Sequence, residues 1–176
     1  MKHKRVKQAV LSLCLPAVLG MVLMGCSNPS KAANPVPQIY VAGAYGEGEG
    51  AAYTPCYWLN GTRSDLSIGN KETGDAYAIA VSGGSVYAAG RYVPLVKDGP
   101  IPCYWLNGTK YDLSTGEGTY GDACAVAVSG GSVYVAGYYY GDAASTPCYW
   151  VGAERHDLPI GNAPEGPAWA IAVELR

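Results

Sequence analysis

The chain has 176 residues, of which 49% are hydrophobic and only 15% charged, with 24 Gly, 15 Tyr and no Phe, a composition that excludes a disordered chain and a long helical array. Four of its 12 basic residues lie within the first seven positions, whereas all 14 acidic residues follow position 25, so the rest of the chain is acidic and a basic face for nucleic acid is not expected. Beyond that first segment His156 is the only histidine, which excludes a multi-histidine metal site, and we expect no cofactor.

The first 25 residues have the layout of a secretory signal peptide. A basic start is followed by an apolar run over residues 9–25, which Pro16 interrupts and which ends in small residues. A membrane-spanning helix is the alternative, but such a helix needs about 20 apolar residues. This run is shorter and contains a proline and two glycines. We therefore expect the segment to be removed during export.

The apolar run closes with Leu23-Met24-Gly25-Cys26, which resembles the lipobox of bacterial lipoproteins. The resemblance implies cleavage before Cys26 and lipidation of its thiol and new amine. It also implies a bacterial cell-envelope protein, held by lipid at the outer membrane or the cell surface. Several acyl chains together anchor a protein stably, because each buried methylene contributes about 0.8 kcal/mol. Residues 26–38 are polar and proline-containing, which predicts a flexible tether after the lipidated cysteine.

From residue 39 onward the sequence repeats itself at intervals of about 47 residues. Three strings recur in the same order, and they are IYVAG with its relatives VYAAG and VYVAG, PCYWLNGT with its relative PCYWVGAE, and AYAIAV with its relatives ACAVAV and AWAIAV. Self-similarity at a period between 20 and 50 residues indicates a repeat architecture. We expect one β-repeat domain over 39–176, with repeats over about 39–85, 86–132 and 133–176.

Each repeat is predicted to hold four short strands. The VYVAG strings are rich in β-branched and aromatic residues, Asn-Gly at 60–61 and 107–108 supplies a tight turn after each CYWL strand, and glycine pairs at 83–84 and 130–131 join the AIAV and VYVAG strands. The order AIAV, VYVAG, CYWL and a last strand ending in Asp-Leu gives a meander that runs from buried to exposed. No stretch has helical periodicity.

The predicted fold is all-β, with three repeats of four strands in a propeller-like arrangement, and a β-trefoil or β-prism fits the same numbers. Because the first repeat begins at Ile39 without an AIAV strand, a strand predicted at Ala168–Val173 would complete it. Propellers typically have four to eight blades. Three repeats in one chain therefore also indicate a possible homodimer, closed by exchange of terminal strands.

The order A-x-A-I-x-x-x-G-x-V-x-x-G followed by Y-W-x-N-G-x-x-x-D-L, which covers residues 39–173, resembles extracellular repeats of bacterial propeller-like proteins, including the HAF repeats. The resemblance implies a propeller-like protein outside the cytoplasm. It implies no particular activity, because the shared residues belong to the scaffold.

Cysteine and tryptophan recur in phase within the PCYW strings, where alternation places them on one face of a strand. Free cysteine is among the most buried residue types, so these side chains are predicted to pack in the core as free thiols and indoles. Disulfides between equivalent positions would need Cα atoms within about 7 Å, closer than neighbouring repeats usually lie. The predicted core residues are Cys56, Trp58, Cys103, Trp105, Cys148 and Trp150.

The segments 44–54, 91–101 and 138–146 differ between repeats, whereas the strings beside them nearly repeat. Repeat scaffolds commonly place binding on such loops. The candidate binding residues are Tyr45, Glu47, Glu49, Tyr53, Arg91, Tyr92, Lys97, Asp98, Tyr138, Tyr139, Tyr140 and Asp142.

The function predicted from these features is that of a lipid-anchored binding or scaffolding module for a protein or glycan, and not of an enzyme. A lectin-like module is the first alternative, because exposed aromatic faces stack on sugars. A glycan-active hydrolase is a weaker alternative, because nothing selects a catalytic pair among the 14 carboxylates.

Overall fold

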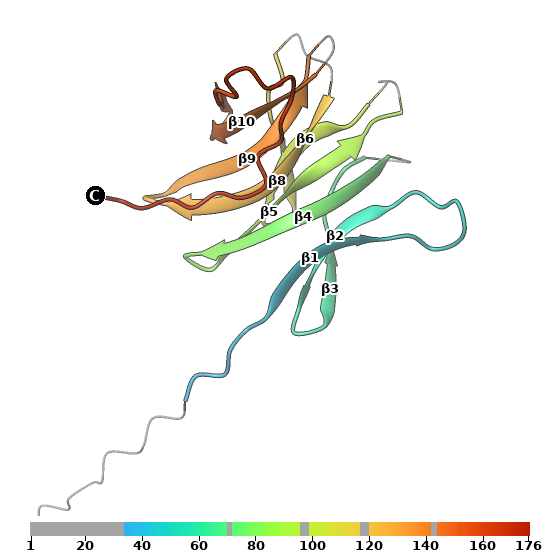
Figure 1. Cartoon of the computed structure of the whole chain (residues 1–176). Coiled ribbons are helices and arrows are strands. Elements are labelled where there is room, and N and C mark those ends of the chain that lie inside the picture. The colour runs from blue at the N-terminus through green and yellow to red at the C-terminus, as the bar shows by residue number, and fades with distance from the viewer. Residues whose placement is uncertain (1–33, 70–71, 96–98, 117–119, 142–143) are drawn as a thin grey trace, which may run out of the picture. The chain divides into compact units, whose positions relative to one another are not determined.

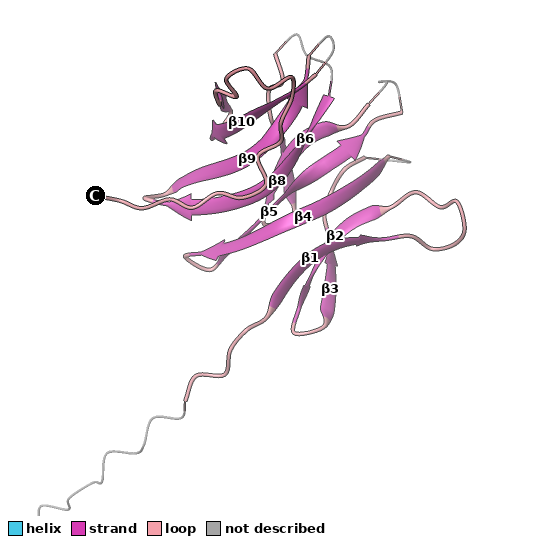
Figure 2. Cartoon of the chain, viewed as in Figure 1, coloured by secondary structure: helices cyan, strands magenta, loops and turns pink. Residues whose placement is uncertain are grey.

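The computed structural model describes residues 34–69, 72–95, 99–116, 120–141 and 144–176, so the predicted signal peptide and Cys26 lie outside the described residues. Within these ranges the chain is all-β, and no helix long and apolar enough to cross a membrane occurs in them. The strands, drawn in magenta in Figure 2, are β1 (Tyr40–Tyr45), β2 (Thr54–Leu59), β3 (Thr62–Asp65), β4 (Thr73–Ser82), β5 (Ser85–Val93), β6 (Ile101–Leu106), β7 (Thr109–Asp112), β8 (Tyr120–Ser129), β9 (Ser132–Tyr140), β10 (Ser145–Val151) and β11 (Glu154–Asp157).

The strands form three antiparallel sheets in chain order, as Figure 1 shows. The first contains β1, β2 and β3, the second runs from β4 to β7, and the third runs from β8 to β11. This confirms the all-β prediction and, for the second and third sheets, the predicted order of AIAV, VYVAG, CYWL and Asp-Leu strands. The same register recurs as well, because Cys56 pairs with Asp65, Cys103 with Asp112 and Cys148 with Asp157.

The hairpins turn where the glycines and asparagines predict. Asn60 and Asn107 each have a φ of 50°, and the glycine after each has a φ of 85°, the left-handed conformations that a two-residue turn needs. Each asparagine has a second role, because its Oδ1 accepts a hydrogen bond of 2.9 Å from the backbone N–H at the start of the neighbouring strand, Ile39 for Asn60 and Val86 for Asn107. Asn-Gly therefore fixes both the turn and the strand beside it.

The two longest strands, β4 and β8, begin the second and third sheets and contact each other, so we call them the inner strands. A bulge interrupts each of them. The register shifts between Ala76 and Ala78 in β4, and between Ala123 and Ala125 in β8. A bulge leaves one residue unpaired and redirects its side chain. The unpaired residues are Tyr77 and Cys124, which occupy the same position of the recurring sequence.

Neighbouring sheets pack face to face through apolar side chains. Leu66, directly after β3, packs in one cluster with Trp105 of the second sheet, and Leu113, directly after β7, packs in a matching cluster with Trp150 of the third. Each tryptophan also donates an indole hydrogen bond to the sheet before it, over 2.7 Å from Trp105 to the carbonyl of Ser67 and 2.9 Å from Trp150 to that of Ser114. Each buried indole is thus both packed and hydrogen-bonded.

The predicted strand at Ala168–Val173 is wrong, and the first sheet has three strands instead of four. The C-terminal segment, red in Figure 1, runs along β8 and β9 of the third sheet. The start of the segment explains this course, because the Gly166 N–H donates to the carbonyl of Ser145 over 3.1 Å. The equivalent glycines near the starts of β4 and β8 do the same, Gly74 to the carbonyl of Tyr53 and Gly121 to that of Pro100. The segment follows the sheet that precedes it, and it forms no ladder with a described strand.

Candidate functional site

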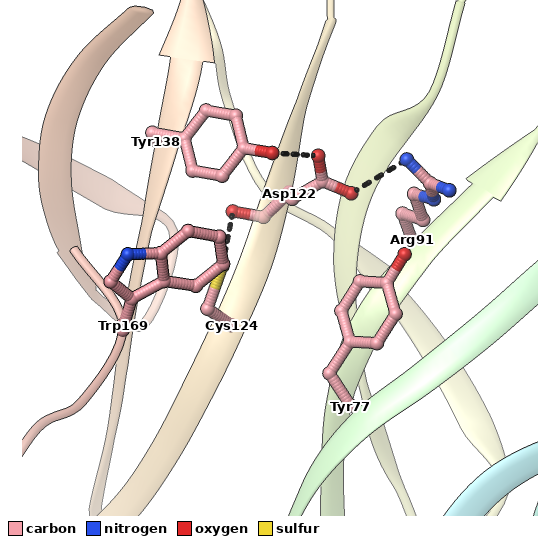
Figure 3. A pocket seen from close by; sticks show the side chains of 6 residues that line it. All are labelled: Tyr77, Arg91, Asp122, Cys124, Tyr138 and Trp169. Atoms are coloured by element: carbon pink, nitrogen blue, oxygen red, sulfur yellow. Dashed lines mark hydrogen bonds and ion pairs between the residues drawn. The ribbon is translucent and has the colours of Figure 1, made fainter. Parts of the chain in front are cut away.

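A pocket of about 320 Å³ lies beside the bulges of the inner strands (Figure 3). Its walls come from β4, β5, β8, β9 and the C-terminal segment, so it gathers residues far apart in the sequence. The lining residues are Tyr77, Arg91, Asp122, Cys124, Tyr138 and Trp169.

Five of these six lining residues occupy only two positions of the recurring sequence. Tyr77, Cys124 and Trp169 are equivalent to one another, as second residues of the AYAIAV, ACAVAV and AWAIAV strings. Arg91 and Tyr138 both follow the glycine that ends a VYAAG or VYVAG string. The strands around these positions are nearly identical, yet the residues at them all differ. The pocket is therefore built from the places where the scaffold sequence varies.

Asp122 is the polar centre of the pocket. It is almost fully buried, and its Oδ2 accepts a hydrogen bond of 2.7 Å from the hydroxyl of Tyr138. Its Oδ1 lies 3.1 Å from Nη1 of Arg91, an ion pair, but has no hydrogen-bond partner among the described residues. Arg91 also reaches Asp75 of β4, with 3.4 Å between Nε and Oδ2. The carboxylate is thus held between Tyr138 and Arg91, and its Oδ1 is buried against the guanidinium.

Tyr77, Tyr138, Arg91 and Cys124 are held in their ordinary protonation states at neutral pH. Burial, followed by the hydrogen bond to Asp122, raises the pKa of Tyr138, and burial also raises the pKa of Tyr77. Burial opposes the charge on Arg91, but the neighbouring Asp122 carboxylate and other groups raise its pKa overall. Burial, then the charge of Asp122, raises the pKa of the Cys124 thiol to about 11. A thiol with that pKa is protonated at neutral pH and is a poor nucleophile.

Aromatic rings form the exposed part of the site. Trp169 is 67% exposed and Tyr77 45% exposed, although both line the pocket. The ring of Trp169 meets that of Tyr138 edge to face, with centroids 6.0 Å apart. A second hollow of about 340 Å³ shares Trp169 and Tyr138 and adds polar neighbours such as Ser145 and Glu165. Broad aromatic faces and hydrogen-bonding groups therefore lie next to each other.

Two candidate binding residues, Arg91 and Tyr138, lie in the pocket, and Tyr140 lines the neighbouring hollow. The expectation that these are loop residues is wrong, because β5 extends to Val93 and β9 to Tyr140. Tyr92 and Tyr139 are strand residues for the same reason. Pairing continues this far because the inner strands β4 and β8, ten residues each, supply ladder partners up to Val93 and Tyr140.

Three further candidates have a structural environment that recurs in each sheet. The hydroxyls of Tyr45, Tyr92 and Tyr139 donate to Asp65, Asp112 and Asp157 over 3.0–3.1 Å. A cation lies over each ring, 3.1–3.9 Å from its centroid, and pairs with the same aspartate; these cations are Arg63, Lys110 and Arg155. These contacts tie the VYVAG strand to the outermost strand across the CYWL strand.

The remaining candidates that the structure describes do not line the pocket. Glu47, Glu49 and Tyr53 are exposed in the connection between β1 and β2. Lys97, Asp98 and Asp142 lie outside the described residues. Among the residues that the structure covers, no group of three or more His, Cys, Asp or Glu side chains could hold a metal ion.

Five of the six predicted core residues are fully buried, and Trp58 is the exception. Cys56, Cys103, Cys148, Trp105 and Trp150 have no exposed surface, and the three cysteines are free thiols. Burial raises the pKa of all three, to about 12 for Cys148. Trp58 is only partly buried, because none of the described strands forms a sheet in front of the first one to cover it.

Four lining residues were not among the sequence-based candidates: Tyr77, Asp122, Cys124 and Trp169. A signal for three of them is present in the sequence, since Tyr, Cys and Trp alternate at one position of otherwise matching strings. The bulges that turn Tyr77 and Cys124 toward the pocket leave no comparable mark in the sequence. A scan against protein-family models and searches of curated proteins and of solved structures find no match to this chain.

Proposed function

We propose that the protein is a binding module that holds a small ligand in the pocket around Asp122, and that it is displayed on the bacterial cell envelope by a lipid on Cys26. The observation that carries the binding role is the convergence of the variable positions. Tyr77, Cys124 and Trp169, equivalent in sequence but different in chemistry, line one pocket together. Packing alone gives no reason for three unlike residues at one scaffold position.

A saccharide is the ligand class that fits this pocket best. Sugars present apolar ring faces that stack on aromatic side chains, and a rim of hydroxyls that seek charged or amide partners. Trp169 and Tyr77 offer exposed rings, and the partly exposed Arg91 offers a guanidinium that the buried Asp122 carboxylate holds in place. The ligand would lie against the rings with hydroxyls directed toward the ion pair.

Catalysis on the glycan is the second candidate, and the pocket gives it less support. Glycoside hydrolysis ordinarily needs two carboxyl groups, one to donate a proton and one to attack or activate water. Among the described residues that line this pocket, Asp122 is the only carboxylate, and Tyr138 and Arg91 already engage it. Cys124 is held as a thiol. Binding without turnover therefore fits the arrangement better.

For the architecture we propose a propeller-like array in which each sheet is one blade. Supporting this arrangement, the inner strands β4 and β8 contact each other, and each sheet packs its face on the next. The pocket then lies where inner strands meet, at the centre of the array, a position that propellers leave hollow. The predicted lipid and the tether over 26–38 would hold this array at the membrane surface.

The test is a glycan array followed by calorimetric titration of the best-bound saccharide. We expect Trp169→Ala to weaken binding about fivefold or more, since an aromatic stacking contact contributes about 1 kcal/mol beyond its area. Tyr53→Ala is the matched control, because Tyr53 is 55% exposed, comparable with Tyr77, but lies outside the pocket. Equal affinities for the two variants, or no saccharide bound by the unaltered protein, would refute the proposal.

A further inference from the structure

The first sheet presents an uncovered face and edge. Val41 of β1 is 49% exposed, whereas its equivalents Ala88 and Val135 have no exposed surface. Trp58 is partly exposed, whereas Trp105 and Trp150 are fully buried. In the second and third sheets, β4 and β8 pair with the strands equivalent to β1, which are β5 and β9. No described strand pairs with β1 on that side.

The third sheet leaves exposed the surface that, in the first and second sheets, packs against the tryptophan of the next sheet. Leu158 is 37% exposed, although its equivalents Leu66 and Leu113 are buried beneath the tryptophan of the next sheet. Ser67 and Ser114, the residues after those leucines, receive the indole hydrogen bonds of that tryptophan. The corresponding acceptor in the third sheet is the carbonyl of Pro159.

The C-terminal segment runs along β8 and β9 of the same sheet. Its side chains alternate, with Ile171 and Val173 partly buried and Ala170 and Ala172 exposed, as expected of a strand whose ladder is unmade. Its sequence AWAIAV matches that of β4 and β8. The pairing of those strands then predicts a register, because Ala80 pairs with Tyr87 and Ala127 with Tyr134. By equivalence, Ala172 would pair with a Tyr40.

We propose that two copies of this chain dock head to tail, each inserting its segment 168–173 beside β1 of the other and covering the other's first sheet with its third. Leu158 of one copy then packs beneath Trp58 of the other, whose indole donates to the carbonyl of Pro159. Both halves of the contact already exist twice within the chain, between its first and second and its second and third sheets.

A second copy fits this surface better than closure within one chain. The two uncovered faces belong to the first and last sheets of the stack, and in the structure both stay exposed. In a dimer with a two-fold axis, the third sheet of each copy covers the first sheet of the other, so both uncovered faces are buried at once. The result has six sheets, within the usual range of closed propellers, whereas three sheets are below it.

Cross-linking of the full chain in the membranes of its expression host tests the register. In the double variant Tyr40→Cys with Ala172→Cys, opposed strand residues lie at a separation that a disulfide spans. After oxidation with copper–phenanthroline in air, we expect a reducible species of two chains as the main product. Each single variant is a control and should give none of it.

The mass of the cross-linked product of the double variant distinguishes the alternatives. A link within one chain would mean that the chain closes on itself, a ladder of larger species would mean an open array, and no link would mean that the surfaces do not meet; each result overturns the proposal. Adding Leu158→Asp should abolish the two-chain product, because it places a charge beneath Trp58. Leu95→Asp, at an exposed leucine of another surface, should leave it unchanged. Loss of the link with both aspartates would also contradict the proposed contact.

Discussion

A glycine substitution tests how the bulges build the site. Gly90 and Gly137 lie opposite the bulges in central strands, are buried, and have no left-handed φ, so alanine is allowed there by the backbone. A Cβ at Gly90 would nonetheless overlap the carbonyl oxygen of Asp75, and one at Gly137 that of Asp122. Both oxygens belong to the bulged strand, so the glycines permit the bulge that directs Tyr77 and Cys124.

The cost of this overlap can be worked out approximately. Overpacking a core by one methyl group costs about 1–3 kcal/mol, and here the neighbour is backbone in a paired strand, which cannot rotate away. The unfolded chain loses some freedom with alanine, which offsets about 0.4–1 kcal/mol. For a chain of this size, a net loss of about 1–2 kcal/mol lowers Tm by about 3–8 °C. We expect that fall for Gly90→Ala and Gly137→Ala in calorimetry.

Gly43 is the matched control at the equivalent position of β1. There a Cβ would approach only the ring of Trp58, 2.9 Å from Cζ3, and that partly exposed side chain is free to shift. In dilute protein Gly43→Ala should change Tm by less than about 1 °C. If all three variants lose the same stability, the bulge is not what requires glycine, and the reasoning fails.

Two further predictions concern the cysteines. Cys56, Cys103 and Cys148 should react with a thiol reagent only after unfolding without reductant, and finding no thiols after unfolding would instead indicate disulfides. Cys124 has a pKa of about 11, so in the folded protein at pH 8 it should react about a hundredfold more slowly than an ordinary thiol, and faster as the pH rises. In a bacterial host Cys26→Ala should abolish incorporation of a fatty-acid analogue, as the lipobox resemblance implies, and label that persists on the variant would contradict it.

The strands could be predicted because their signals are local. Asn-Gly at 60–61 and 107–108 fixes the turns through backbone conformation, and the recurrence of the same strings carries the pairing order from one sheet to the next. The burial of Trp105 could be predicted in the same way, from its phase in the strand. The burial of Trp58 could not, because it depends on whether another sheet lies in front of the first.

The site was harder to predict because it depends on geometry that the sequence does not mark. Arg91 and Tyr138 were candidates because they lie where the repeats diverge, but their strands extend further than the divergence suggests. Asp122 could not be distinguished from Asp75, since both precede an alanine in the same string. Only the fold shows that Asp122 is buried between Arg91 and Tyr138, while Asp75 is partly exposed at the edge of the ion pair.

One geometric feature connects the site with the proposed assembly. The bulged inner strand projects its unpaired residue toward the pocket, and a backbone oxygen at the bulge approaches the glycine of the paired strand. Trp169 is at the bulge position of the C-terminal segment, and it already lines the pocket although that segment has no ladder partner. Pairing of segment 168–173 with β1 of a second copy would fix the position of Trp169, as the pairing of β4 with β5 on both sides of the bulge fixes that of Tyr77. The exposed ring that the proposed ligand would stack on is therefore the one whose position the second copy would fix, so assembly and ligand binding should strengthen each other.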